Sequence, residues 1–195
     1  FTYTLSNTGG SSTATVTVTI GARGFFVKND APAGGSGSQT SPFNTLLAGV
    51  TAAAGVNGAQ VVVFRGDGTA TGQNVAVALS ANQAIIAQDP VNPPVISGPI
   101  TLASNTTLAN LRLVGTVGGD AVIGTGIVGA TLSNLTVANT TANGVNMTNP
   151  TGTVSMTGLA MSNIGQHALP LSTNTGGLNL TVNGLSVNNT TANVS

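Results

Sequence analysis

The chain has 195 residues, of which only 4% are charged, and its four Lys or Arg residues balance four Asp residues to a formal net charge of zero. So little charge excludes the basic face that nucleic-acid binding requires and the polybasic patch that attaches a protein to an anionic membrane. Cysteine is absent, which excludes disulfides and zinc–thiolate sites, and no apolar run is long enough to span a bilayer. Because the sequence begins without Met and inside an apparent strand, we expect a mature or excised piece of a longer protein.

Residues 1–22 alternate between threonine and apolar side chains on either side of a turn sequence within residues 6–12. This alternation predicts a β-hairpin, and a two-stranded hairpin is only marginally stable alone in water. The segment resembles the last two strands of bacterial immunoglobulin-like or cadherin-like domains, which implies that the rest of a domain or a neighbouring chain completes it. A threonine row could also suggest ice binding, although a solvent-facing strand is the interpretation we favour. The residues expected to form inter-subunit strands are Thr13, Thr15, Val16, Thr17, Val18 and Ile20.

Residues 23–60 predict a transition into a second region. Residues 24–27 form a short apolar strand, and residues 28–38 have the composition of a loop. A helix is predicted over residues 41–54, with Ser41 as its N-cap and Pro42 at its first position. We expect this helix to cover the open edge of the structure that follows.

Residues 59–108 contain short apolar strands at irregular spacing. The turn between the first two of them, residues 65–69, includes an Arg-Gly-Asp triplet. That triplet is found in integrin-binding segments, but it is common by chance and Asp-Gly forms turns without any partner. We therefore interpret it as a turn.

The region from residue 108 onward repeats a short phrase. Its core leucines are Leu111, Leu135, Leu159 and Leu185, which are 24, 24 and 26 residues apart. Leu108, Leu132, Met156 and Val182 form a second file with the same steps. Within one unit, residues 135–137, 145–147 and 154–156 alternate as three short strands separated by turn residues. A repeat this short predicts a β-solenoid whose coils each need their neighbours for stability.

Asparagine recurs at the same step, at Asn139, Asn163 and Asn189. These residues predict an internal structural ladder, in which the amide of each side chain bonds to the one on the next coil. Sugar or ice contact is the alternative for such a row. The ladder is favoured because the row falls in a turn and keeps the coil period.

The order of segments over residues 24–195 resembles a right-handed parallel β-helix region of large secreted bacterial surface proteins, adhesin-like or autotransporter-like. The resemblance is carried by residues 25–27, the Gly/Ser loop, residues 41–46, 61–64 and 82–86, and the Asn-Leu-Thr-Val-Ala-Asn coils. It implies an all-β fold with about 24 residues per coil. The functions that it implies are those of adhesins, surface stalks and filaments, or of polysaccharide lyases, and the fold alone does not decide among them.

The titratable residues favour a structural role over catalysis. A lyase needs clustered acidic calcium ligands and a base, and a glycosidase needs two nearby carboxylates. The four acids fall in four separate loops, at Asp30, Asp67, Asp89 and Asp120, and His167 is the only histidine. We therefore predict no catalytic, metal or cofactor site in this piece.

The sequence thus predicts an extracellular, cell-surface β-solenoid over residues 23–195, a stalk or filament subunit, after an immunoglobulin-like strand pair over residues 1–22. Expected partners are other copies of the chain or adjoining domains, joined through the ends of the solenoid, with surface glycans as a third hypothesis. The alternative function is a polysaccharide-binding or lyase-like β-helix whose active site is absent from the chain or lies outside it.

Overall fold

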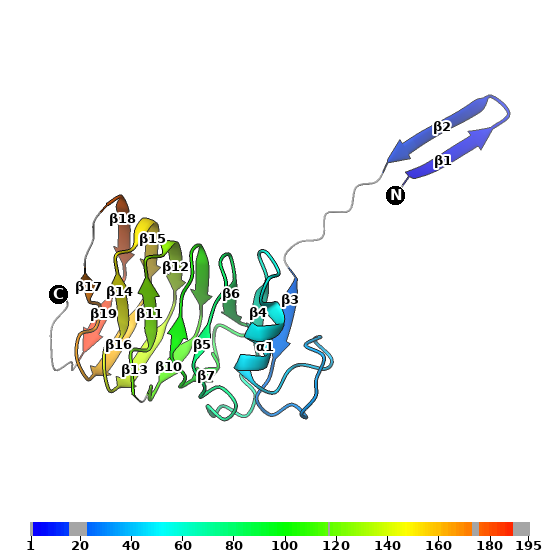
Figure 1. Cartoon of the computed structure of the whole chain (residues 1–195). Coiled ribbons are helices and arrows are strands. Elements are labelled where there is room, and N and C mark those ends of the chain that lie inside the picture. The colour runs from blue at the N-terminus through cyan, green and yellow to red at the C-terminus, as the bar shows by residue number, and fades with distance from the viewer. Residues whose placement is uncertain (1, 16–22, 117, 173–175, 189–195) are drawn as a thin grey trace.

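The computed structural model describes residues 2–15, 23–116, 118–172 and 176–188. About 46% of the chain is strand, and parallel strands stack into a β-solenoid of about five turns with about 24 residues in each coil. Figure 1 shows the coils side by side along one axis. The predicted fold class, with an N-terminal hairpin and one short helix, is confirmed.

Three parallel sheets form the sides of the solenoid. Sheet 1 contains β3 (Gly24–Val27), β4 (Gln60–Val63), β6 (Ala84–Ala87), β9 (Thr106–Ala109), β12 (Val128–Ser133), β15 (Thr151–Thr157) and β18 (Leu178–Asn183). Sheet 2 contains β7 (Val95–Ile96), β10 (Arg112–Val114), β13 (Thr136–Thr140), β16 (Ala160–Ile164) and β19 (Ser186–Asn188). Sheet 3 contains β5 (Val77–Ala78), β8 (Ile100–Thr101), β11 (Val122–Thr125), β14 (Val145–Thr148) and β17 (Leu171–Ser172).

The coil period sets the register of the strands. Leu132 of β12 pairs with Leu108 of β9 on one side and with Met156 of β15 on the other. All three side chains are fully buried, whereas Val182, which pairs with Met156 in the last described coil, is 39% exposed. Because alternate residues of a strand point to opposite faces, an in-register 24-residue repeat fills the interior with one continuous hydrophobic core.

The core leucines lie at the corner between sheets 1 and 2. Leu111, Leu135 and Leu159 are each 1% exposed, and Leu185 is partly buried. Each leucine follows a residue with a positive φ, which turns the chain from one sheet into the next. These residues are Asn110 (59°), Asn134 (50°), Gly158 (64°) and Gly184 (69°). Asn and Gly tolerate the left-handed conformation, which explains why one or the other stands at this corner.

The helix α1 (Leu46–Ala53) begins later than predicted. The N-cap is Thr45, whose Oγ1 accepts a hydrogen bond from the Ala48 amide at 3.2 Å, so the assignment of Ser41 is wrong. The stretch before Thr45 is not helical because Phe43 pairs with Val27 of β3 and Ser41 pairs with Ser38. The Phe43 amide donates to the Phe26 carbonyl at 2.9 Å, and the Phe43 carbonyl accepts from the Lys28 amide at 2.8 Å.

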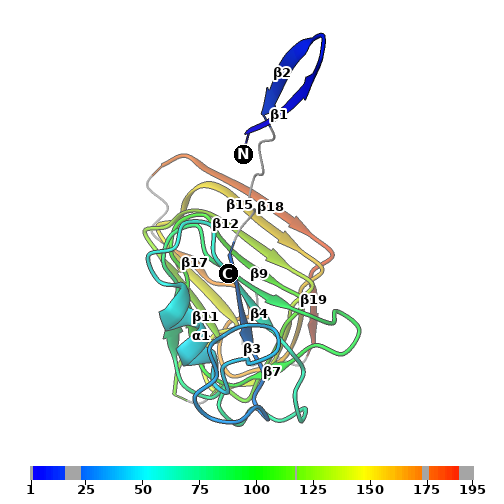
Figure 2. The same ribbon diagram turned by 90° about the vertical axis from the view of Figure 1, so that its right-hand side faces the viewer.

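A loop caps the first coil, and the helix forms one of its sides. The loop from Gly37 to Phe43 covers the outer edge of β3, where we had expected the helix. Helix α1 precedes β4 as β5 precedes β6, so it forms the third side of the first coil (Figure 2). It packs Leu46, Val50 and Ala53 into the core.

The N-terminal hairpin consists of β1 (Thr2–Asn7) and β2 (Gly10–Thr15), joined by the two-residue turn Thr8-Gly9. This turn is tighter than the predicted one over residues 6–12. Every side chain described in the two strands is exposed, and within the described chain the hairpin contacts no other element. Of the strand residues expected between subunits, Thr13 and Thr15 lie in β2; Val16, Thr17, Val18 and Ile20 lie outside the described residues.

Candidate functional site

Two residues of the predicted asparagine row, Asn139 and Asn163, each stand one residue before the end of a strand of sheet 2, β13 and β16. The Nδ2 of Asn163 donates to Oδ1 of Asn139 at 2.9 Å, and both residues have positive φ (52° and 55°). Asn189 lies outside the described residues. Both described side chains are exposed, because the inward positions belong to the next residues, Thr140 and Ile164. The expected side-chain bond between successive coils is therefore present in this pair, but its expected internal position is wrong, because both side chains lie on the outer surface of the coil.

A second asparagine pair was not predicted. Asn134 Nδ2 donates to Asn110 Oδ1 at 3.0 Å at the corner between sheets 1 and 2. The signal was present in the sequence, since both residues precede core leucines 24 residues apart. Gly158 stands at the same corner in the next coil, where an added Cβ would meet Asn134 Oδ1 at 2.7 Å. Both asparagine pairs therefore serve the coil geometry.

Asp67 belongs to the Arg-Gly-Asp turn, and its carboxylate is occupied. It accepts hydrogen bonds from the Thr69 amide at 2.8 Å, from the Thr69 hydroxyl at 2.9 Å and from the side chain of Asn29. The bond from the Thr69 amide, followed by the bond from Asn29, lowers the pKa of Asp67 below its ordinary value of 3.8. All three bonds reach Oδ1 of Asp67, and through them this carboxylate stabilises the turn.

The remaining acids lie in separate places. Asp30 forms an ion pair with Lys28 at 3.2 Å. Asp89 accepts from Asn92 Nδ2 at 3.2 Å and from the Val91 amide at 2.8 Å, and these bonds lower its pKa below 3.8.

Asp120 begins a polar stack across three coils. Its Oδ1 accepts from the Asn143 amide at 2.8 Å and from Asn143 Nδ2 at 2.7 Å, while its Oδ2 accepts from Asn146 Nδ2 at 2.7 Å. Asn143 Oδ1 in turn accepts from the His167 amide at 3.0 Å. His167 therefore joins the stack through its backbone, in the turn between β16 and β17. This arrangement links three successive coils through polar groups.

A shallow depression of about 190 Å³ brings together two arginines that are distant in the sequence. Arg65 comes from the turn after β4, and Arg112 is the first residue of β10. The depression lies where sheet 2 begins, because the coil containing β4 and β5 has a turn there where later coils have a strand. Val91, Asn92 and Val95 complete most of the wall. Sequence reasoning missed this site, since irregular loops separate its residues.

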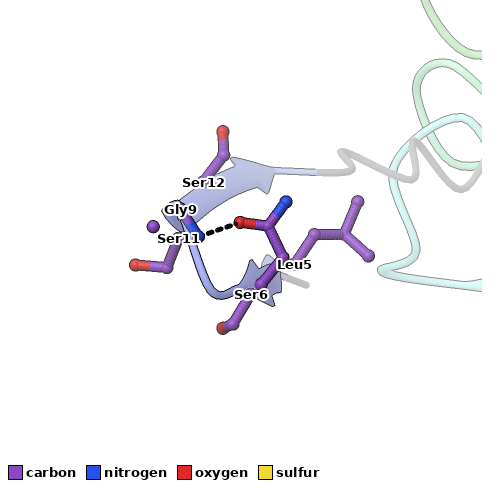
Figure 3. A pocket seen from close by; sticks show the side chains of 7 residues that line it. Leu5, Ser6, Gly9, Ser11 and Ser12 are labelled. Carbon is purple, nitrogen blue, oxygen red and sulfur yellow. Dashed lines mark hydrogen bonds between the residues drawn. The ribbon is translucent and has the colours of Figure 1, made fainter.

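Another depression, of about 490 Å³, lies at the tip of the N-terminal hairpin. It is lined by residues of both strands, including Leu5 and Ser12, and the Gly9 amide donates to Asn7 Oδ1 at 2.8 Å within it (Figure 3). A two-stranded ribbon supplies only one wall, and no titratable side chain lines the depression. It therefore offers little for holding a ligand.

Within the described ranges, no group of three or more His, Cys, Asp or Glu residues could hold a metal ion. In that same part of the chain, no helix is long and apolar enough to cross a membrane. The asparagine pairs, the polar stack and the arginine depression are thus the features from which function has to be argued. Comparisons with protein-family models, with curated proteins and with solved structures found no match.

Proposed function

We propose that this chain is a structural and adhesive β-solenoid of the cell exterior, a segment of a surface stalk or a filament subunit. The observation that carries the proposal is the continuous core that runs through every coil from Phe25 to Leu169. Core residues of one coil pair with those of the next throughout the described solenoid. A stack held by parallel hydrogen bonds and a shared core is suited to bearing load along its axis.

The placement of the polar groups supports this role over catalysis. Oδ1 of Asp67 accepts hydrogen bonds that close a turn, and both carboxylate oxygens of Asp120 accept hydrogen bonds that join coils. The exposed asparagine amides bond between coils, as Asn163 does to Asn139. These polar contacts stabilise the rod, and the low charge leaves neighbouring rods little repulsion to overcome.

The resemblance to bacterial surface proteins supports an extracellular location and a hairpin that belongs to an immunoglobulin-like domain or to an inter-subunit contact. The fully exposed hairpin fits this proposal, because two strands without a covered face need further strands for stability. Strand addition to the hairpin would supply them.

Negative-stain electron microscopy of the purified chain over a dilution series tests the assembly. Regular fibres that persist on dilution identify a filament subunit, and discrete short rods identify a stalk segment. Partly unfolded aggregates at every concentration would contradict both forms of the proposal.

A second assay tests the structural role against the enzymatic alternative. The chain is incubated with uronate and neutral polysaccharides, and the release of reducing or unsaturated ends is measured. We expect no release above the rate without protein; product formation that scales with protein concentration would overturn the structural proposal.

A further inference from the structure

The depression between Arg65 and Arg112 contains a large part of the positive charge of this protein. The whole chain has four Lys or Arg residues, and two of them line this one depression. No acidic side chain lines it. Asp89, whose negative charge interacts with Arg65, lies outside this lining. The lining itself therefore carries two positive charges and no negative one.

The two guanidinium groups have donors to spare. Arg65 Nη1 donates to Asn92 Oδ1 at 3.4 Å, which is long for a hydrogen bond. Within the described part of the chain, no side-chain hydrogen bond or ion pair of Arg112 is present. Each guanidinium carries five N–H donors in a planar fork that matches a carboxylate. Both side chains are exposed and can reach a ligand without desolvating a buried charge.

Apolar groups line the same depression as the arginines. Val91 is 83% exposed, and Pro93 and Val95 line the same depression. A sugar ring presents C–H groups on its faces and hydroxyl or carboxylate groups at its edge, which suits a lining of this kind. The volume of about 190 Å³ is below the roughly 300–1,000 Å³ of pockets that enclose a whole drug-sized ligand, so one ring fits better than a long segment.

We infer that the depression binds a uronic-acid residue of an acidic polysaccharide, with its carboxylate between Arg65 and Arg112. The inference rests on the proposed adhesive function and names its ligand class. A glycan is favoured over an extended peptide because β10 has β7 and β13 on its two sides, leaving no free backbone edge at Arg112. Beyond Arg112, the outward positions in register are Thr136, Ala160 and Ser186, a small uncharged surface along which a polymer can continue.

Isothermal titration of the full chain with an oligogalacturonate tests the inference. The comparison ligands are a neutral galactan oligosaccharide of equal length, a sulfated oligosaccharide and a polyglutamate peptide. We expect the oligogalacturonate to bind at least tenfold more tightly than the neutral sugar, and the binding to weaken as salt increases. Equal affinity for the neutral sugar would overturn the inference. Tighter binding of polyglutamate would overturn the inference in favour of an acidic peptide as the ligand. Tighter binding of the sulfated sugar would overturn it in favour of a sulfate group in place of the carboxylate.

Substitution of the arginines locates the site. Arg65→Gln and Arg112→Gln are each expected to raise the dissociation constant at least tenfold, since each removes a charged hydrogen-bond donor. Arg112→Lys should recover only part of the affinity, because the charge remains while the planar fork is lost. The control is Arg23→Gln, whose guanidinium lies over the Phe25 ring at 4.7 Å and outside the depression. Equal affinity in wild type and in both glutamine variants would overturn the site.

The outcomes separate this inference from the proposed function. Rods that form normally but do not bind uronate would contradict the ligand and leave the structural role intact. Bound uronate that is cleaved would contradict the structural role and leave the site intact.

Discussion

The regular coils, residues 105–188, and the first coils, residues 24–104, enclose the same kind of core with different connections. In the regular coils, the corner between sheets 1 and 2 always carries a left-handed Asn or Gly just before the core leucine, as Asn134 does. In the first coils, loops of unequal length join the strands, and the turn around Arg65 and Asp67 is one of them. Most of the charged residues lie in those loops. The comparison shows that the regular coils supply the continuous core, while the irregular loops of the first coils supply most of the charged groups on the surface.

The largest expected effect tests the core of the regular coils. Leu135→Ala removes a side chain that is 1% exposed, and we expect the free energy of unfolding to fall by about 2–5 kcal/mol. Leu185→Ala, at the equivalent but only partly buried position, should cost less. Leu5→Ala is the control, since that leucine is 69% exposed in the hairpin. Urea unfolding measures all three, and equal losses at Leu135 and Leu5 would contradict the shared core.

A buried amide distinguishes the first coils. Gln73 is 1% exposed, and its Nε2 and Oε1 have no partner in the described residues. Because an unpaired buried polar group costs about 1–3 kcal/mol, Gln73→Met should raise the free energy of unfolding by an amount of that order. Gln39→Met, at an exposed position, is the control. A loss of stability in Gln73→Met alone would show that the amide is hydrogen-bonded in solution.

The corner residue tests what the regular coils require locally. Gly158 has φ of 64°, and Gly158→Ala should cost about 1–2 kcal/mol because alanine disfavours that conformation. Gly158→Asn should cost less, since asparagine tolerates the conformation and occupies the same corner at positions 110 and 134. Thermal unfolding of the two variants compares them directly. If alanine proves the milder change, backbone conformation does not govern this corner.

The smallest expected effect concerns acid. The pKa of Asp67 is lower folded than its ordinary 3.8, so the folded state binds fewer protons than the unfolded state. Its contribution to stability is therefore complete above about pH 4 and is lost as the pH falls through the folded pKa. Asp67→Asn should flatten the stability profile below pH 4 and leave its shape above pH 5 unchanged, as followed by urea unfolding at a series of pH values. Parallel profiles for wild type and variant would show that the turn makes no pH-dependent contribution.

The sequence predicted the regular coils well because each of their determinants recurs locally. The spacing of Leu111, Leu135 and Leu159 already contained the register, and their burial follows from it. The start of α1 could not be predicted in this way. Ser41 and Pro42 have the local signature of a helix start, but Phe43 pairs with Val27 of β3, a contact that no local pattern reveals.

The candidate site could not be predicted from the sequence for a related reason. Arg65 and Arg112 come together only because one coil has a turn where the following coils have a strand of sheet 2. No repeat relates the two residues, so spacing carries no signal. The asparagine pairs differ in this respect, because Asn110 and Asn134 keep the coil period and could have been identified from it.

The in-register pairing of Ser133 with Thr157 has a consequence for how such a chain can change length. Residues 134–157 form one complete coil, so joining Ser133 directly to Gly158 would leave every later strand in its phase. The loss would shorten the rod by one strand spacing, ~4.8 Å, and duplication of the same segment would lengthen it equally. Removing half a coil would instead displace the leucines from the interior. The length of this molecule can thus change in steps of one whole coil without any change in the register of the remaining strands.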